Sequence, residues 1–291
     1  MALPKTRIAQ SESQLRRRVL RLLSRSRSPA LQQGESDLFS GKAPSPERTA
    51  ISTPTRSISE FLSYLCAAAP TGEIFLFGGL LRDVALFGAR GFESDADVVV
   101  EGHWDGIVRH LNSMGAQQNR FGGFRLSIDG WPVDIWHARD TWAVRQGHVR
   151  YQGIASLTST TIVNWDAILM DWRTRRFITR ARYFEEVQNR LLDIVLTENP
   201  NPLGAAVRAF RHFCLMDASK TTVAAARYLS SSAREFTPAV ILAAESRSYP
   251  NPVINREVLG FFSDIESDAE APLQQQFVAT ANVFEQHSLF E

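Results

Sequence analysis

The stretch that decides the fold is Phe77-Gly78-Gly79-Leu80-Leu81-Arg82-Asp83, followed by Ser94-Asp95-Ala96-Asp97-Val98-Val99-Val100. The short apolar run Glu73-Ile74-Phe75-Leu76-Phe77 comes before the glycines and predicts a buried strand. The pattern over residues 80–87 is helical, so the glycine turn leads from a strand into a helix N-terminus. Backbone N–H groups at such a terminus favour a triphosphate, and glycine lets the backbone approach it closely. We therefore expect Gly78 and Gly79 to bind a nucleotide.

The acidic pair supplies the second half of this pattern. Asp95 and Asp97 flank Ala96 just before three valines, so on a strand both carboxylates project to one face. Two like charges side by side usually need a cation, and Mg²⁺ takes carboxylate oxygens together with substrate phosphates. A paired-metal site of this kind can activate an attacking hydroxyl and stabilise the leaving pyrophosphate.

A third carboxylate lies in a predicted hairpin. Residues 121–128 and 131–136 read as strands joined by Asp129-Gly130, a strong two-residue turn signal. Asp134 lies in the second strand, and its apolar neighbours Val133 and Ile135 point the other way. We expect Asp134 to meet the Asp95 and Asp97 strand. Three acidic groups beside a glycine turn suit nucleotidyl transfer.

These residues resemble the DNA polymerase β nucleotidyltransferase superfamily, and within it the bacterial CCA-adding enzymes (tRNA nucleotidyltransferases) and poly(A) polymerases. The family's Gly-Gly-x-x-Arg-Asp turn and Asp-x-Asp pair are matched here, with Arg82 and Asp83 in the turn. Asp134 and Arg139 match a family acidic residue and an arginine five positions later. Residues 161–167 resemble a weakened Phe-Thr-x-Asn-Ala segment, and residues 208–213 an Arg-Ala-x-Arg-Phe helix. The resemblance covers residues 74–215 and is more specific in its first half.

The resemblance implies an enzyme that transfers a nucleoside monophosphate from an NTP, such as ATP, to an RNA 3′-end and releases pyrophosphate. It implies Mg²⁺, in a two-metal site, as cofactor, and NTP and RNA, particularly tRNA, as partners. The implied catalytic residues and metal ligands are Asp95, Asp97 and Asp134, with Asp134 helping to deprotonate the attacking hydroxyl. The implied nucleotide-binding residues are Gly78, Gly79, Arg82, Arg139, Asn164, Arg208 and Arg211.

Several of these residues also have structural interpretations. Asn164 can hold a backbone segment instead of touching a ligand. Arg139 can contact a phosphate or form a surface ion pair with Asp140. Arg208 and Arg211, three apart on one side of a helix, can face a nucleotide or pair with surface carboxylates. We interpret Asp83 as mainly structural.

Two segments depart from the family pattern. The family's Arg-Arg-Asp falls on Leu157-Thr158-Ser159-Thr160, which carries no charge, and its Glu-Asp-x-x-Arg falls on Glu198-Asn199-Pro200-Asn201-Pro202, where only the glutamate matches. An amide cannot replace a carboxylate's charge, and proline has no N–H donor, so base selection by the CCA rule is not supported. The alternatives are a toxin-like or second-messenger nucleotidyltransferase with a non-tRNA acceptor, and a catalytically reduced module that binds nucleotide or RNA without turnover.

The predicted fold is an α/β (α+β) nucleotidyltransferase head with a mixed sheet, followed by an all-helical C-terminal region. With 291 residues and 44% hydrophobic residues, the chain can bury a sizeable core. We expect an N-terminal arm over residues 1–57, the head over 58–160 and a helical neck and C-terminal domain over 161–291. Helices are predicted over residues 58–69, 80–87, 104–114, 183–196, 202–216, 221–229, 238–245, 255–262 and 272–285.

The N-terminal arm is strongly basic, with eleven basic against four acidic residues, whereas the whole chain has a net charge of only +1. We interpret it as a solvated, partly disordered tail, in which residues 13–23 can form a short basic helix. Contact with RNA phosphates and a role as an organelle transit peptide are alternatives.

Composition also limits the location and the cofactors. No stretch approaches a membrane span or an apolar secretory core. The two cysteines argue against a disulfide framework or a cysteine zinc site, and the histidines form no metal spacing. We expect a cytoplasmic protein, and the sequence indicates no oligomeric state.

Overall fold

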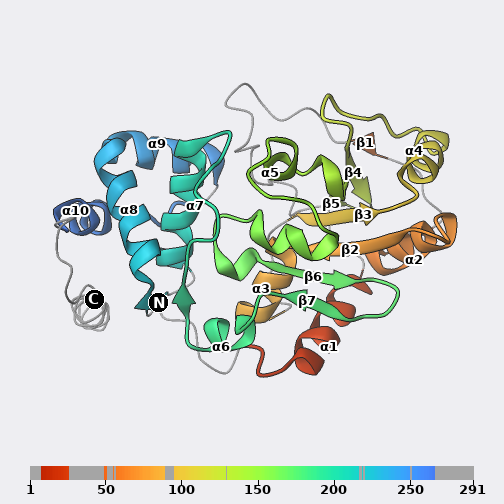
Figure 1. Ribbon diagram of the computed structural model, residues 1–291, viewed down its shortest axis with the longest axis horizontal. Helices are drawn as coiled ribbons and strands as arrows, with labels where there is room; N and C mark the ends of the chain where they lie inside the picture. Colours follow the sequence, from red (N-terminus) through yellow and green to blue (C-terminus); the bar gives the residue numbers. More distant parts are fainter. Residues whose placement is uncertain are drawn as a thin grey trace.

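The computed structural model describes residues 8–25, 49–50, 55, 57–88, 95–128, 130–215, 218, 220–249 and 251–265. Ser94, Asp129 and the helix predicted over residues 272–285 lie outside the described residues. Over the described residues, a head with a mixed sheet is followed by a helical region at one end of the molecule (Figure 1). The predicted fold class is confirmed.

The head is built on a seven-stranded sheet with the order β1-β4-β5-β3-β2-β6-β7. The pairs β1–β4 and β3–β5 are parallel, and the other neighbours are antiparallel. The hairpin predicted around residues 121–136 is confirmed as β4 and β5. The strands are β1 (Thr49–Ala50), β2 (Glu73–Phe77), β3 (Ala96–Glu101), β4 (Phe124–Ile128), β5 (Trp131–His137), β6 (Ile168–Asp171) and β7 (Phe177–Thr179).

Alternate residues of each strand point to opposite faces of the sheet, and the two faces pack against different elements. On one face, residues such as Leu76 and Val98 join the main core with α2 (Ile58–Ala68), α3 (Gly79–Phe87) and α4 (Trp104–Ser113). The opposite face carries a smaller apolar cluster: Phe75, Phe77, Val99, Ala138, Leu157 and Leu169. The strand alternation therefore places Asp97 and Asp134 on the face with the smaller cluster.

The short helix predicted over residues 13–23 is present, but the solvated character expected for the arm is wrong for residues 8–25. Residues 8–25 form an ordered segment whose helix α1 (Glu12–Leu23) is capped by the Ser11 hydroxyl and buries Leu15 and Val19. The N–H of Ala9 donates to the carbonyl of Ala85 in α3 at 2.7 Å. The apolar stripe of α1 outweighs its arginines, which keep to the exposed and partly exposed sides. The rest of the arm lies outside the described residues, apart from β1 and positions 55 and 57.

The helical region that we expected from residue 161 begins later in the chain, because two strands follow residue 161. Strands β6 and β7 pair into the head's sheet, so we propose that the head extends through residue 179. The helix predicted over 183–196 ends early as α6 (Tyr183–Gln188), because Arg190 takes a left-handed φ of 51°. Strand β8 (Leu191–Leu192) follows and pairs in parallel with β9 (Lys220–Thr221).

The helical region confirms the four helices predicted there, with shifted ends: α7 (Pro202–Leu215), α8 (Val223–Glu235), α9 (Pro238–Ser248) and α10 (Arg256–Asp264). Phe210 of α7 and Phe262 of α10 meet edge to face, with ring centroids 5.7 Å apart. Figure 1 shows these helices gathered at the end of the molecule opposite α2 and α4. Among the helices of the described residues, none has the length and apolar character needed to cross a membrane.

Candidate active site

The strand register brings the acidic residues and the end of β2 into one row across the sheet. Phe77 pairs with Asp97, Asp97 with Asp134, and Asp134 with Arg125. On the other side of Phe77, Leu169 of β6 completes the row. Neighbouring strands lie ~4.8 Å apart, so the two carboxylates leave the same face of adjacent parallel strands. The row has an apolar half on β6 and β2 and a charged half on β3, β5 and β4.

The glycine turn lies directly beside Asp97. Gly78 follows Phe77 and has φ 66° and ψ −121°, a conformation that a residue with a Cβ rarely adopts. Its N–H donates to the carbonyl of Ile168 at 3.0 Å, and Gly79 is the first residue of α3. The first N–H groups of a helix have no partner within the helix, so this turn offers donors next to the acidic row.

The acidic residues suit a divalent cation in their chemistry, but they are not assembled as a three-ligand site. Asp95 lies one residue before β3, and both Asp95 and Asp97 are partly exposed. Among the described residues, no group of three or more His, Cys, Asp or Glu side chains is gathered to hold a metal ion. Asp134 lies 3.7 Å from Nε of Arg125, in an ion pair of two partly exposed side chains. Magnesium binding therefore stays a prediction.

Arg139 lies in the 3-10 helix η3 (Ala138–Asp140), directly after β5, and is exposed. Its guanidinium stacks over the Tyr151 ring at 4.6 Å, and the Tyr151 hydroxyl donates to Glu101 at 2.5 Å. Burial and the Glu101 carboxylate raise the pKa of Tyr151 above its ordinary value. Asp140, the predicted surface partner of Arg139, lies 3.8 Å from Nδ1 of His137 instead. Phosphate contact by Arg139 stays a prediction.

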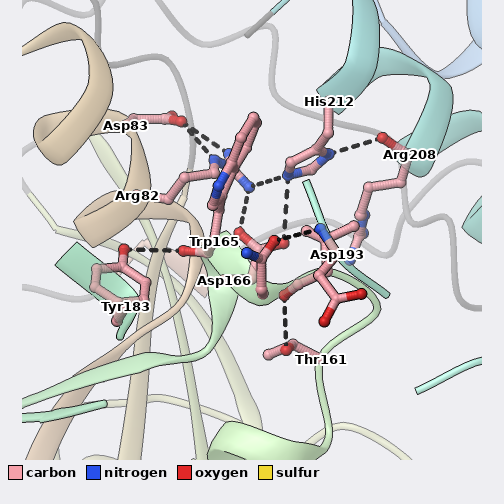
Figure 2. A network of polar contacts seen from close by, with 11 residues as sticks. Arg82, Asp83, Thr161, Trp165, Asp166, Tyr183, Asp193, Arg208 and His212 are labelled. Carbon is pink, nitrogen blue, oxygen red and sulfur yellow. Dashed lines mark hydrogen bonds and ion pairs between the residues drawn. The ribbon is translucent and has the colours of Figure 1, made fainter. Parts of the chain in front are cut away.

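Arg82, by contrast, points into the interior (Figure 2). Its side chain is 9% exposed, and its guanidinium contacts Asp83, Asp166 and His212. Asp166 comes from the 3-10 helix η5 (Asn164–Asp166), and His212 comes from α7. Burial alone would raise the pKa of Asp166, but the charge of Arg82 holds it below its ordinary value. The structural role that we expected for Asp83 fits its contacts with Arg82.

Two other predicted nucleotide-binding residues are engaged in contacts that hold the fold. Asn164 is 2% exposed; its side-chain amide donates to the carbonyl of Leu191 and its carbonyl accepts from the N–H of Asp193. Arg211 forms a 2.7 Å ion pair with Glu245, which is fully buried, and stacks over a tyrosine ring. These contacts favour the structural interpretation of both residues.

Arg208 lies on the side of α7 that faces the head. Its positive charge is one of those that lower the pKa of Asp166, and its carbonyl accepts a hydrogen bond from Nδ1 of His212 at 2.7 Å. Figure 2 shows its side chain extending from α7 past His212. Of the two arginines predicted on this helix, Arg208 is the one directed towards the head.

Sequence reasoning missed Arg125, Asp166 and His212. The alternation across the Asp129-Gly130 turn carried a signal for Arg125, because it places Arg125 opposite Asp134. Asp166 lies within residues 161–167 and His212 within residues 208–213, but neither residue matches a position of the family motifs that these segments resemble. Only the fold shows that these two segments meet.

The uncharged segment at residues 157–160 is part of the 3-10 helix η4 (Ile154–Ser159) and the residue after it. Leu157 is buried in the small apolar cluster with Phe75 and Leu169. The hydroxyls of Thr158 and Thr160 donate to carbonyls three residues earlier, at 2.8 Å each. The segment therefore packs against the sheet and presents no charge there.

Comparisons with known proteins give a fold but no sequence family. No protein-family model and no curated protein matches the sequence. Among solved structures, an apo tRNA-processing enzyme matches with TM-score 0.52 and 16% identity over 82% of this chain and 66% of the other. A CCA-adding enzyme with ATP matches with TM-score 0.52 and 15% identity over 71% and 50%. A tRNA nucleotidyltransferase complexed with a primer tRNA and an incoming ATP analog matches with TM-score 0.50 and 15% identity over 79% and 70%.

The extent of these matches defines what they show. The chain spans half of the CCA-adding enzyme and about two thirds of the tRNA-processing enzyme that it matches. At this level of identity the likeness concerns the arrangement of helices and strands. The resemblance predicted from the glycine turn and the acidic pair is confirmed at that level: the chain has the fold of the CCA-adding enzymes and tRNA nucleotidyltransferases.

Proposed function

We propose that this protein is a nucleotidyltransferase that transfers a nucleoside monophosphate from an NTP to an RNA 3′-hydroxyl, with tRNA as the first acceptor to test. The observation that carries the proposal is the row across the sheet. It puts a glycine turn at a helix N-terminus next to Asp97, and Asp97 next to Asp134. Donors for a triphosphate and carboxylates for the reacting hydroxyl therefore lie on one surface.

Each of these residues has a separate role in the proposed reaction. The N–H of Gly79 and the next N–H groups at the start of α3 bind the triphosphate, Gly78 forms the turn that presents them, and Arg139 contacts an outer phosphate. The 3′-hydroxyl oxygen forms a bond to the α-phosphorus, the bond to the β-phosphate oxygen breaks, and pyrophosphate leaves. Asp134 accepts the hydroxyl proton. Mg²⁺, held by Asp95, Asp97 and Asp134, would stabilise the charge on the attacking oxygen and on pyrophosphate.

Two of the matched structures support tRNA as the acceptor and ATP as the nucleotide donor in this proposal. One is a complex with a primer tRNA and an incoming ATP analog, and another is a complex with ATP. The uncharged residues 157–160 and the prolines at 200 and 202 do not support base selection by the CCA rule. We therefore propose an active site that takes an NTP, with ATP as the first donor to test, and assign no added sequence.

A second candidate is a module that binds nucleotide or RNA without turnover. The ion pair between Arg125 and Asp134 favours it, because it occupies the Asp134 carboxylate that a metal ion or a hydroxyl would need. We rank it second, since a 3.7 Å pair at a partly exposed site can open when a cation and phosphates enter.

The test is incorporation of each α-labelled NTP, with Mg²⁺ and deacylated tRNA, analysed by gel and by mass of the labelled product. We expect labelled tRNA with the wild-type protein and at least a hundredfold loss in Asp97→Asn, a typical loss when transition-state charge stabilisation is removed. Glu73→Gln is the matched control, because Glu73 is an exposed carboxylate at the far end of β2. ATP binding without label in RNA, protein or any small product would support the binding module and overturn the enzyme.

A further inference from the structure

We propose that His212 and Asp166 are positioning residues, which fix the glycine turn against α7 by holding the Arg82 guanidinium between them. Arg82 lies in the first helical turn after Gly78, and its N–H donates to the Gly78 carbonyl at 3.1 Å. The guanidinium and the glycine turn therefore move together. Whatever holds the guanidinium also holds the donors of the turn.

The guanidinium uses all three of its nitrogens (Figure 2). Nε and Nη2 contact Oδ1 of Asp83 at 2.9 and 2.8 Å. Nη1 donates to Oδ1 of Asp166 at 2.5 Å and contacts Nε2 of His212 at 3.0 Å. The contact with Asp83 lies within α3, the helix that carries Arg82. Asp166 and His212 provide the links, one to η5 and one to α7.

The contacts of His212 assign its proton. The carbonyl of Arg208 can only accept, so Nδ1 of His212 carries the hydrogen in their 2.7 Å contact. The guanidinium can only donate, so Nε2 of His212 accepts from Arg82. The neutral imidazole therefore connects the backbone of α7 to Arg82. Asp166 lies farther from Nε2, with its Oδ2 at 3.5 Å.

Because these side chains are buried, the loss of one contact between them is costly. The side chains of Arg82, Asp166 and His212 are 9%, 10% and 4% exposed. A buried guanidinium that loses an acceptor keeps the cost of removing that N–H from water. An apolar side chain at position 212 could fill the same volume, but it would accept no hydrogen bond and would leave α7 free to shift against the turn.

The consequence for the proposed reaction concerns nucleotide affinity. This inference rests on the proposed function only in that the glycine turn binds the triphosphate. If α7 shifts against α3, the N–H donors of the turn lose their fixed distance from the acidic row. We expect weaker ATP binding with a smaller effect on the rate of the bound complex, so KM rises more than kcat falls.

The experiment compares His212→Phe and His212→Gln with Arg227→Gln in the full chain. Phenylalanine keeps a ring but removes the acceptor, and glutamine restores an acceptor. Arg227→Gln is the control, because Arg227 is an exposed residue of the neighbouring helix α8. Asp166→Asn, an isosteric change, is the second test should the phenylalanine variant fail to fold.

Two readouts separate this inference from the proposed function. Hydrogen exchange of the first hydrogen-bonded α3 amides, residues 82–84, needs no nucleotide. We expect about tenfold faster exchange in His212→Phe and Asp166→Asn, and little change in the other two variants. The Kd for ATP should rise about tenfold in the same two variants. Unchanged exchange in both variants would overturn the positioning role. Faster exchange in a protein that binds no ATP would overturn the proposed function and leave the positioning role intact.

Discussion

Replacing Asp97 by asparagine should stabilise the metal-free protein while abolishing its activity. Asp97 and Asp134 are register neighbours on adjacent parallel strands, so their carboxylates lie on the same face of the sheet. The two carboxylates repel each other, so each raises the free energy of the other. In the proposed function, a cation and phosphates would offset this repulsion when they bind.

The size of the effect follows from the geometry. At a separation of about 5 Å and an effective dielectric constant of about 20, two carboxylates repel by about 3 kcal/mol. The guanidinium of Arg125, with its Nε 3.7 Å from Asp134, offsets part of that repulsion. We expect about 1 kcal/mol to remain, which corresponds to a rise in Tm of about 2–4 °C for a chain of this size.

The assay is thermal unfolding of wild-type and Asp97→Asn protein in chelator-treated buffer, repeated with Mg²⁺ and ATP. The variant should unfold at the higher temperature without ligands, and only the wild type should gain stability when they are added. Glu73→Gln, at the far end of β2, should gain as much stability as the wild type when Mg²⁺ and ATP are added. A lower Tm for Asp97→Asn in metal-free buffer would refute the reasoning, since it would show that the carboxylate serves the fold.

Further predictions follow from single contacts. Gly78→Ala should lower the free energy of unfolding by about 1–2 kcal/mol in urea, because its φ of 66° is strained for a residue with a Cβ. Arg125→Gln should tighten Mn²⁺ binding, followed by electron paramagnetic resonance, because Asp134 loses its ion-pair partner; unchanged affinity would argue against a metal role for that carboxylate. Leu15→Ala, at a fully buried position of α1, should cost about 2–5 kcal/mol, whereas a dispensable arm would show no change. Asp166→Asn tests pH dependence. Burial would raise the pKa of Asp166, but the neighbouring guanidinium holds it below its ordinary value. The carboxylate therefore stabilises the fold above about pH 4, and this stability is lost as the pH falls towards the folded pKa. The deficit of the variant should be largest at neutral pH and shrink below pH 4; a constant deficit would contradict the assignment.

The head was largely predictable because its signals are local. The apolar run ending at Phe77 predicted β2, and the alternation around Asp134 predicted its strand and its face. The relation between Asp97 and Asp134 needed only the assumption that their strands are neighbours, which the register confirms. Alternation fixes the face of every residue once one is known.

The misses come from tertiary contacts that override local pattern. Strands β6 and β7 are short, and Ile168-Leu169-Met170 alone does not distinguish a strand from part of a helix. The burial of α1 depends on α3, which lies far along the chain. The arginine content of the arm favoured a solvated tail, but composition does not show that the arginines lie on one side of α1 and the apolar residues on the other. Two partners of Arg82, Asp166 and His212, lie 84 and 130 residues from it in the sequence, so no local spacing pattern predicts these contacts.

The packing of α1 on α3 has a consequence for the order in which the chain folds during synthesis. The bond from Ala9 to Ala85 joins the start of the described chain to the far end of the helix that carries the glycine turn. On the ribosome, α1 leaves the exit tunnel long before its partner exists, so its apolar side stays unsatisfied until α3 has emerged. Recombinant versions that begin at α2 would therefore leave the side of α3 that α1 covers exposed to water.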